Sequence, residues 1–175
     1  MRAPGPTTPE AAHPDRDVGS TDYVAAGVHT APTYLKWALV FEEPNTKTVW
    51  LGKAVPRDWL AAGVDPVAVH NATTRYGRVS YTLAGAAGAG ATEAYTIKAS
   101  IKLPTSYAVA STAPPGGVVL RLRAPAQHAG KLVSVTVGGK PWTAFDANLE
   151  TVRAQWLRDS RAQRWLPARA SFAAA

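Results

Sequence analysis

Hydrophobic and polar side chains alternate along much of the chain, most regularly at residues 95–103. There Tyr, Ile, Ala, Ile and Leu occupy every second position, and Thr, Lys, Ser and Lys lie between them. Because successive side chains of a strand point to opposite faces, this pattern predicts an antiparallel strand with one buried and one solvated face. Further short runs of β-branched or alternating residues, separated by turn signals, lie at 48–51, 67–70, 77–83, 118–123, 132–137 and 150–152.

The number and spacing of these runs predict a mainly β fold, either a sandwich or a barrel. We expect an antiparallel β-sandwich of about six to eight short strands over residues 45–152. Two local signals agree with short elements joined by tight connections. Pro56 can begin a short helical turn, and Gly138-Gly139 can form a two-residue hairpin turn.

The segment YLKWALVFEE, residues 34–43, follows a helical period instead, and we predict a short helix over 33–44. Its apolar side chains cover two adjoining faces, one with Leu35, Ala38 and Leu39 and the other with Tyr34, Trp37 and Phe41. A helix that is apolar over this much of its circumference requires cover on several sides. The rest of the chain offers few helices that could provide it.

The two ends of the chain lack the alternation of the middle. Residues 1–32 are rich in Pro, Thr, Ala and Asp, which predicts a disordered leader. Residues 153–175 are biased toward Arg, Ala and Trp and predict an irregular or helical tail. On this interpretation, a strand that would complete the sandwich after Val152 is missing.

The formal net charge of +7 invites a nucleic-acid interpretation, but the charge is unevenly distributed. Residues 1–150 carry 14 basic and 11 acidic side chains, whereas residues 151–175 carry 5 and 1. The predicted sandwich is therefore close to balanced, and its basic residues do not form a stripe with interleaved aromatics. We expect no nucleic-acid partner.

Cellular location is left undetermined by the sequence. The chain has no cysteine, which excludes disulfides, thiolate metal sites and a cysteine nucleophile. No apolar run reaches the length of about 18 residues that a membrane-spanning helix needs, so we expect no membrane partner. The first residues also lack the apolar core of a signal peptide, although the parent protein could still be exported by a signal outside this chain.

No catalytic, metal-binding or cofactor-binding set can be assigned from the sequence. A G-x-S-x-G motif, a metal-type histidine spacing, a G-x-G-x-x-G motif and a P-loop are all absent. The acids Asp58, Asp146 and Glu150 do not pair convincingly as the two carboxylates of a glycosidase. We therefore name no catalytic residue, no metal ligand and no cofactor.

Several aromatic residues carry a polar group beside a flat apolar ring and so suit carbohydrate stacking: Trp50, Trp59, Tyr76 and Trp142. The same rings could instead cover the open ends of a sandwich core. The segment Arg75-Tyr76-Gly77-Arg78 raises the same question, because it can be a sugar or interface site or only the start of a strand that bends at the glycine.

Four segments of the chain resemble the C-terminal β-sandwich of large bacterial glycoside-hydrolase-like proteins of the six-hairpin, (α/α)6-barrel type. They are TVWLGKAVPRDWL (48–60), TTRYGRVSYTL (73–83), VVLRLRAP (118–125) and VSVTVGGKPWTAFDANLETV (133–152). The resemblance covers residues 33–152, and its motifs are architectural ones.

This resemblance implies a non-catalytic accessory module that supports or docks onto an upstream (α/α)6 catalytic domain, and a chain that is a fragment. The segment 33–44 would be a remnant of that helical domain, with Tyr34, Trp37 and Phe41 as docking residues. Catalytic acids of such enzymes lie in the barrel, so none is carried over.

Two alternatives remain. The first is a free-standing carbohydrate-binding module that takes an oligosaccharide; its candidate sugar or interface residues are Trp59, Arg75, Tyr76, Arg78 and Trp142. The second is a small hydrolase that acts through Asp or Glu.

Overall fold

The computed structural model describes residues 25–88, 95–109, 111–153 and 166–173. The chain divides into two units, residues 1–37 and 38–175. Most of the single described α-helix, α1 (Ala25–Leu39), belongs to the first unit. The second unit contains all eleven described strands, arranged as two sheets.

The smaller sheet has five strands in the spatial order β1-β2-β6-β10-β9. Only β2 and β6 pair in parallel; the other neighbours are antiparallel. The strands are β1 (Val40–Glu42), β2 (Val49–Leu51), β6 (Val118–Arg121), β9 (Phe145–Asp146) and β10 (Thr151–Arg153).

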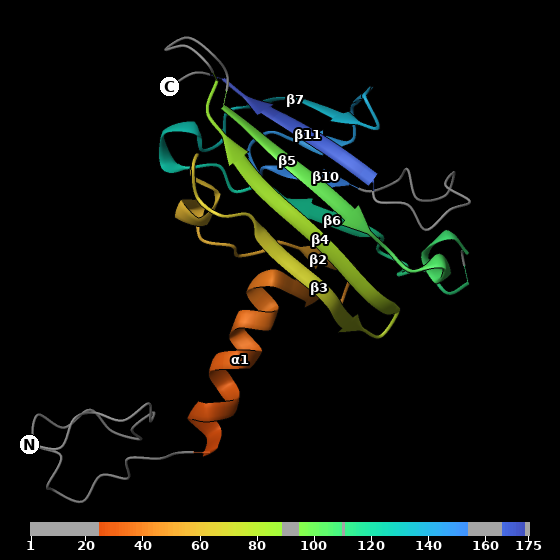
Figure 1. Cartoon of the computed structure of the whole chain (residues 1–175). Helices are drawn as coiled ribbons and strands as arrows, with labels where there is room; N and C mark the ends of the chain where they lie inside the picture. The colour runs from red at the N-terminus through yellow and green to blue at the C-terminus, as the bar shows by residue number, and fades with distance from the viewer. Residues whose placement is uncertain (1–24, 89–94, 110, 154–165, 174–175) are drawn as a thin grey trace, which may run out of the picture. The chain divides into compact units, whose positions relative to one another are not determined.

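The larger sheet is antiparallel throughout and has the order β3-β4-β5-β11-β7-β8. Figure 1 shows β3, β4, β5, β11 and β7 side by side in front of β2, β6 and β10. The strands are β3 (Val67–Thr74), β4 (Gly77–Ala86), β5 (Tyr95–Lys102), β7 (Leu132–Val137), β8 (Lys140–Trp142) and β11 (Leu166–Phe172). Short 3-10 turns, η1 (Arg57–Leu60), η2 (Thr105–Ala108) and η3 (Ala126–His128), lie in the connections.

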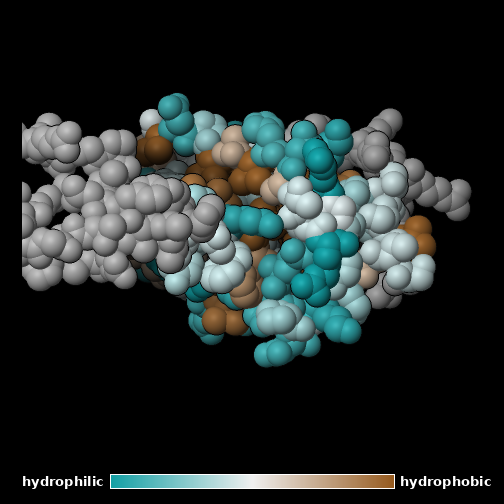
Figure 2. Space-filling model, turned by 90° about the horizontal axis from the view of Figure 1, so that it is seen from below, coloured by the Kyte–Doolittle hydropathy of each residue, from teal (hydrophilic) through white to brown (hydrophobic). Residues whose placement is uncertain are grey.

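One hydrophobic core fills the space between the two sheets. The smaller sheet contributes Leu51, Leu120 and Val152, and the larger one contributes residues such as Tyr81 and Phe172, all at most 1% exposed. Two sheets that share one core form a sandwich, which confirms the predicted fold class. On the face drawn in Figure 2, hydrophobic residues lie in separate areas among hydrophilic ones.

The seven alternating or β-branched runs predicted as strands all contain one. On β5, the side chains of Tyr95, Ile97, Ala99 and Ile101 are buried and Lys98 and Lys102 are exposed, as the alternation predicts. Thr96, predicted on the solvated face, is buried instead. The two-residue turn is also present, since Gly138 and Gly139 both have positive φ angles, 57° and 79°, between β7 and β8. Such a turn favours glycine because both residues take a left-handed conformation.

Residues 166–172 correct the prediction of an irregular or helical tail. They form β11, which lies between β5 and β7 and pairs with both. Ala168, Ala170 and Phe172 face the core, whereas Arg169 is exposed. The strand that was expected to be missing is therefore supplied by the chain itself. Its alternation is inconspicuous because two of the inward residues are alanines.

The predicted boundaries of the leader and the helix are also wrong. Residues 25–32 are helical rather than part of a leader, while residues 1–24 lie outside the described residues. At the other end, α1 stops at Leu39 and residues 40–42 form β1. Pairing of Phe41 with Trp50 and of Val40 with Leu51 selects the strand, because cross-strand packing outweighs a helical period in so short a segment.

A substitution on β11 tests whether this strand belongs to the core. Ala170→Asp places a carboxylate where the side chain is 1% exposed, and we expect it to lower the free energy of unfolding by more than about 3 kcal/mol. The matched control, Arg169→Gln, changes the exposed neighbour and should shift stability by less than about 0.5 kcal/mol. Urea unfolding of both variants measures this, and similar small effects at both positions would contradict the strand assignment.

Candidate binding site at the loop end of the sandwich

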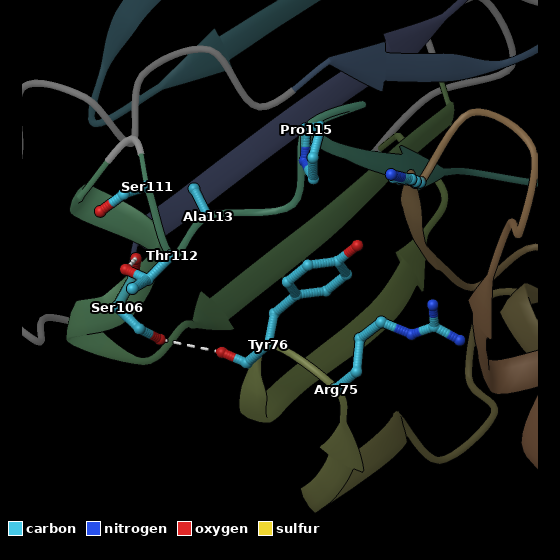
Figure 3. A pocket seen from close by; sticks show the side chains of 8 residues that line it. Arg75, Tyr76, Ser106, Ser111, Thr112, Ala113 and Pro115 are labelled. Carbon is cyan, nitrogen blue, oxygen red and sulfur yellow. Dashed lines mark hydrogen bonds between the residues drawn. The ribbon is translucent and has the colours of Figure 1, made fainter.

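Three connections meet at one end of the sandwich and enclose an open cavity of about 580 Å³. Its lining comes from the β1–β2 loop, the β3–β4 turn and the β5–β6 connection. In Figure 3 the Tyr76 ring points into the cavity, between the Arg75 side chain and the segment with Thr112, Ala113 and Pro115. The lining residues are Lys47, Arg75, Tyr76, Ser106, Ser111, Thr112, Ala113 and Pro115.

The β3–β4 turn is held in one conformation by Thr74 and Gly77. The Thr74 hydroxyl donates to the Gly77 carbonyl oxygen at 2.6 Å and accepts from the Tyr76 N–H at 3.2 Å. Gly77 has φ of 120°, and a Cβ there would lie 2.8 Å from the Pro104 ring. Glycine is therefore required both for the backbone conformation and for the approach of the β5–β6 connection.

The Tyr76 ring packs edge to face against the Tyr107 ring, with a centroid distance of 6.4 Å. The Tyr107 hydroxyl lies 3.1 Å from the Thr74 hydroxyl, and the Ser106 hydroxyl donates to the Tyr76 carbonyl oxygen at 2.8 Å. These contacts join η2 to the β3–β4 turn. One face of the cavity is thus a fixed aromatic ring with hydroxyl groups beside it.

The β1–β2 loop and the β5–β6 connection are joined through Gly116. The Gly116 N–H donates to the Lys47 carbonyl oxygen at 3.2 Å, and the Thr48 hydroxyl donates to the Gly116 carbonyl oxygen at 3.3 Å. A Cβ on Gly116 would lie 2.2 Å from the Thr48 hydroxyl oxygen, so only glycine allows this approach. The backbone carrying Lys47 is therefore fixed against the loop that forms the opposite wall.

In the part of the chain that the structure describes, the cavity lining has two cationic side chains, Lys47 and Arg75, and no acidic one. The Arg75 side chain extends toward β1, where its Nε lies 3.3 Å from Glu42 Oε1. The backbone N–H of Arg75 donates to the same oxygen at 2.8 Å. The Arg75 side chain remains 62% exposed. Lys47 forms no ion pair with another described residue. Lys47, Arg75 and Glu42 together therefore carry a net charge of +1.

The structure divides the five predicted sugar or interface residues. Arg75 and Tyr76 lie together in the cavity, and Arg78 is exposed on β4 outside the lining. Trp59 is 44% exposed on η1, and the Trp142 indole N–H donates to the Arg153 carbonyl oxygen at 3.2 Å. Neither tryptophan lines the cavity, so a platform that combines them with Tyr76 does not form.

The three predicted docking residues are also divided. Tyr34 and Trp37 lie one turn apart on α1, with ring centroids 5.6 Å apart. Phe41 instead lies on β1, half-buried, with the Lys53 ammonium 3.6 Å from its ring centroid. Its inclusion in a helical docking face was wrong, because the helix ends two residues earlier.

The carboxylates considered for catalysis make structural contacts or are exposed. Glu150, 1% exposed, accepts two hydrogen bonds from the Arg57 guanidinium at 3.0 and 2.8 Å and one from the Gly130 N–H at 3.1 Å. Asp146 accepts from the Leu149 N–H at 2.9 Å, and Asp58 is exposed on η1. The described residues contain no group of three or more His, Asp or Glu side chains that could hold a metal ion.

Sequence reasoning missed six of the eight lining residues: Lys47, Ser106, Ser111, Thr112, Ala113 and Pro115. A signal for most of them exists in PTSYAVASTAPPGG, residues 104–117, which is rich in hydroxyl groups and proline. Long connections at the end of a sandwich commonly form binding sites. Nothing in the sequence places Lys47 opposite this segment.

No helix among the described residues is long and apolar enough to cross the membrane. Comparison of the chain with protein-family models, curated proteins and solved structures finds no match. The resemblance to six-hairpin glycoside-hydrolase-like proteins therefore stays a hypothesis, and a function is best argued from the geometry of the chain.

Two buried tyrosines, Tyr95 and Tyr107, predict that the folded chain loses stability at alkaline pH. Burial raises the pKa of Tyr107 and of Tyr95 to about 12, and for Tyr107 the Thr74 hydrogen bond opposes this shift in pKa while the charge of Glu42 adds to it. An unfolded tyrosine has a pKa of about 10. Between these values the unfolded chain releases protons that the folded chain retains, so stability falls as pH rises from about 10 to 12, by up to roughly 1.4 kcal/mol per pH unit and residue.

Denaturant unfolding at a series of pH values measures this fall. Tyr107→Phe should make the fall less steep, because one contributing hydroxyl is lost, whereas Tyr34→Phe changes an exposed ring and should leave the slope as it is. Equal slopes for wild type and Tyr107→Phe would show that Tyr107 is not buried as described.

Proposed function

We propose that this chain is a non-catalytic β-sandwich module of a carbohydrate-active enzyme, and that α1 docks onto a helical catalytic domain of that enzyme. The observation that carries the docking role is the exposure of three large apolar side chains on α1: Tyr34 at 60%, Leu35 at 51% and Trp37 at 46%. Adjacent exposed groups of this size are characteristic of interaction surfaces.

The composition and connection of α1 favour a helical neighbour. Its fifteen residues, AAGVHTAPTYLKWAL, include one lysine and no acid, so the helix is poor in charged side chains. The helix passes into β1 without an intervening loop, since α1 ends at Leu39 and β1 begins at Val40. This direct connection agrees with the interpretation of the helix as a remnant of an upstream helical domain. Side chains such as Tyr34, Leu35 and Trp37 can pack into the grooves of neighbouring helices.

The ion pairs of three glutamates agree with a non-catalytic role for the sandwich. Glu150 is held by Arg57, Glu42 by Arg75 and Glu43 by Lys53, each in an ion pair. A glycosidase needs one carboxyl group to donate a proton and a second to act as base or nucleophile across the sugar. The assignment to a carbohydrate-active enzyme draws its support from the motif resemblance.

A second role, direct contact with a sugar, is favoured by the cavity. Tyr76, a half-buried ring on a fixed turn, lies beside the hydroxyl-bearing residues Ser106, Ser111 and Thr112. The volume of about 580 Å³ lies within the range of roughly 300–1,000 Å³ that is typical of small-molecule sites. This role and docking through α1 use different parts of the chain and can coexist.

Sedimentation equilibrium of the isolated chain tests the docking face. Without its partner the wild-type chain should self-associate, because association buries the apolar side chains of α1. The double variant Tyr34→Ser/Trp37→Ser should be monomeric at the same concentrations and should keep the unfolding transition of the sandwich.

The matched control is Val64→Ser/Val133→Ser, which removes two apolar side chains that are 47% and 57% exposed in the second unit. It should leave the association unchanged. A wild-type chain that is monomeric at all concentrations, or a control that relieves association equally, would contradict docking through α1.

A further inference from the structure

The charges that line the loop-end cavity have one sign. Lys47 and Arg75 approach it from different connections, and no described Asp or Glu lines it. Among the described residues, Glu42 is the only acid that forms an ion pair with either cation, and its carboxylate pairs with Arg75 from β1. Lys47 is thus left with no ion-pair partner among the described residues.

The remainder of the lining suits a ring that carries hydroxyl groups. Tyr76 offers a flat aromatic face, against which the C–H side of a sugar ring can pack. The Ser106 hydroxyl donates to the Tyr76 carbonyl oxygen at 2.8 Å, and the Thr112 hydroxyl donates to the Ser106 carbonyl oxygen at 2.7 Å. Their oxygens can still accept hydrogen bonds from a ligand hydroxyl. The exposed Ser111 hydroxyl can donate or accept.

From these two observations together we propose that the cavity binds a saccharide that carries a carboxylate. The anion is received between Lys47 and Arg75, and the sugar ring packs on Tyr76. This inference rests on the sugar-binding role proposed above and names its substrate class. A neutral saccharide would leave both cations without an added partner, whereas a simple inorganic anion would make no use of the tyrosine face.

Glu42 sets the strength of the attraction. Its carboxylate orients Arg75 and cancels one of the two positive charges near the cavity. Glu42→Gln removes that negative charge, while the side-chain amide oxygen of the new glutamine can still accept from the backbone N–H of Arg75. This substitution should therefore strengthen binding of the acidic saccharide, a gain of function that a loss of folding cannot imitate.

Isothermal titration calorimetry of the full chain at low ionic strength tests the proposal with matched ligands. The acidic probe is α-1,4-linked trigalacturonate; the neutral probes are its trimethyl ester and α-1,4-linked galactotriose. We expect the acidic probe to bind roughly five- to tenfold more tightly than either neutral one. Added salt should reduce this preference because the two cations are exposed and screened.

Variants then assign the preference to the cavity. Lys47→Gln should weaken trigalacturonate binding about two- to fivefold, and Glu42→Gln should strengthen it by a similar factor. Arg78→Gln is the matched control, because it removes one exposed positive charge from β4 outside the cavity and should change affinity by less than about 1.5-fold. Tyr76→Ala should weaken acidic and neutral saccharides alike, about two- to tenfold.

Each contrary outcome has a separate meaning. Equal binding of the acidic and neutral probes, weakened by Tyr76→Ala, would keep the sugar-binding role and overturn the charge preference. Displacement of trigalacturonate by an equal concentration of inorganic sulfate would show anion binding without saccharide recognition and overturn the proposal. Binding of none of the three saccharides would overturn both the proposal and the sugar-binding role, while leaving docking through α1 to its own test.

Discussion

The pairing of β11 with both β5 and β7 is the constraint on which the sandwich depends. Without it the larger sheet would separate into β3-β4-β5 and β7-β8, and both inner edges would expose unpaired backbone groups. Leu166 pairs with Ile101, one residue before the end of β5, just ahead of the connection that forms most of the cavity lining. A strand from the last part of the chain thus supports the loop end where the candidate site lies.

The candidate site is organised by backbone approaches that only glycine permits. Gly77 lets the Pro104 ring lie against the β3–β4 turn, and Gly116 lets the β5–β6 connection lie against Thr48. These two approaches bring Tyr76 and Lys47 to one cavity from strands that are not neighbours. Because the backbone segments that carry these residues are held by hydrogen bonds before a ligand arrives, binding costs less conformational entropy than it would on free loops. The fold therefore supplies a preorganised surface, and α1 supplies a separate apolar one.

The sequence predicts those parts of this account that depend on local patterns. The large inward residues of β5 reveal that strand, and Gly138-Gly139 reveal a turn. The small alanines of β11 conceal an equally regular alternation. Phe41 fits a helical and a strand period alike, and its pairing with Trp50 selects the strand. The oddity of Arg75-Tyr76-Gly77-Arg78 singles out two true lining residues. Lys47 could not be found, since its place depends on contacts between loops that are distant in sequence.

The central claim is that the ligand-binding surface is the loop end of the sandwich, and not Trp59 or Trp142. Titration of the ¹⁵N-labelled chain with trigalacturonate, followed by two-dimensional NMR, tests it most directly because each backbone amide reports on its own surroundings. The account predicts that the largest shifts fall in three segments, residues 46–48, 74–77 and 105–116, while the Trp59 and Trp142 indole signals stay in place. Shifts centred on those two indoles, with the three segments unchanged, would contradict it.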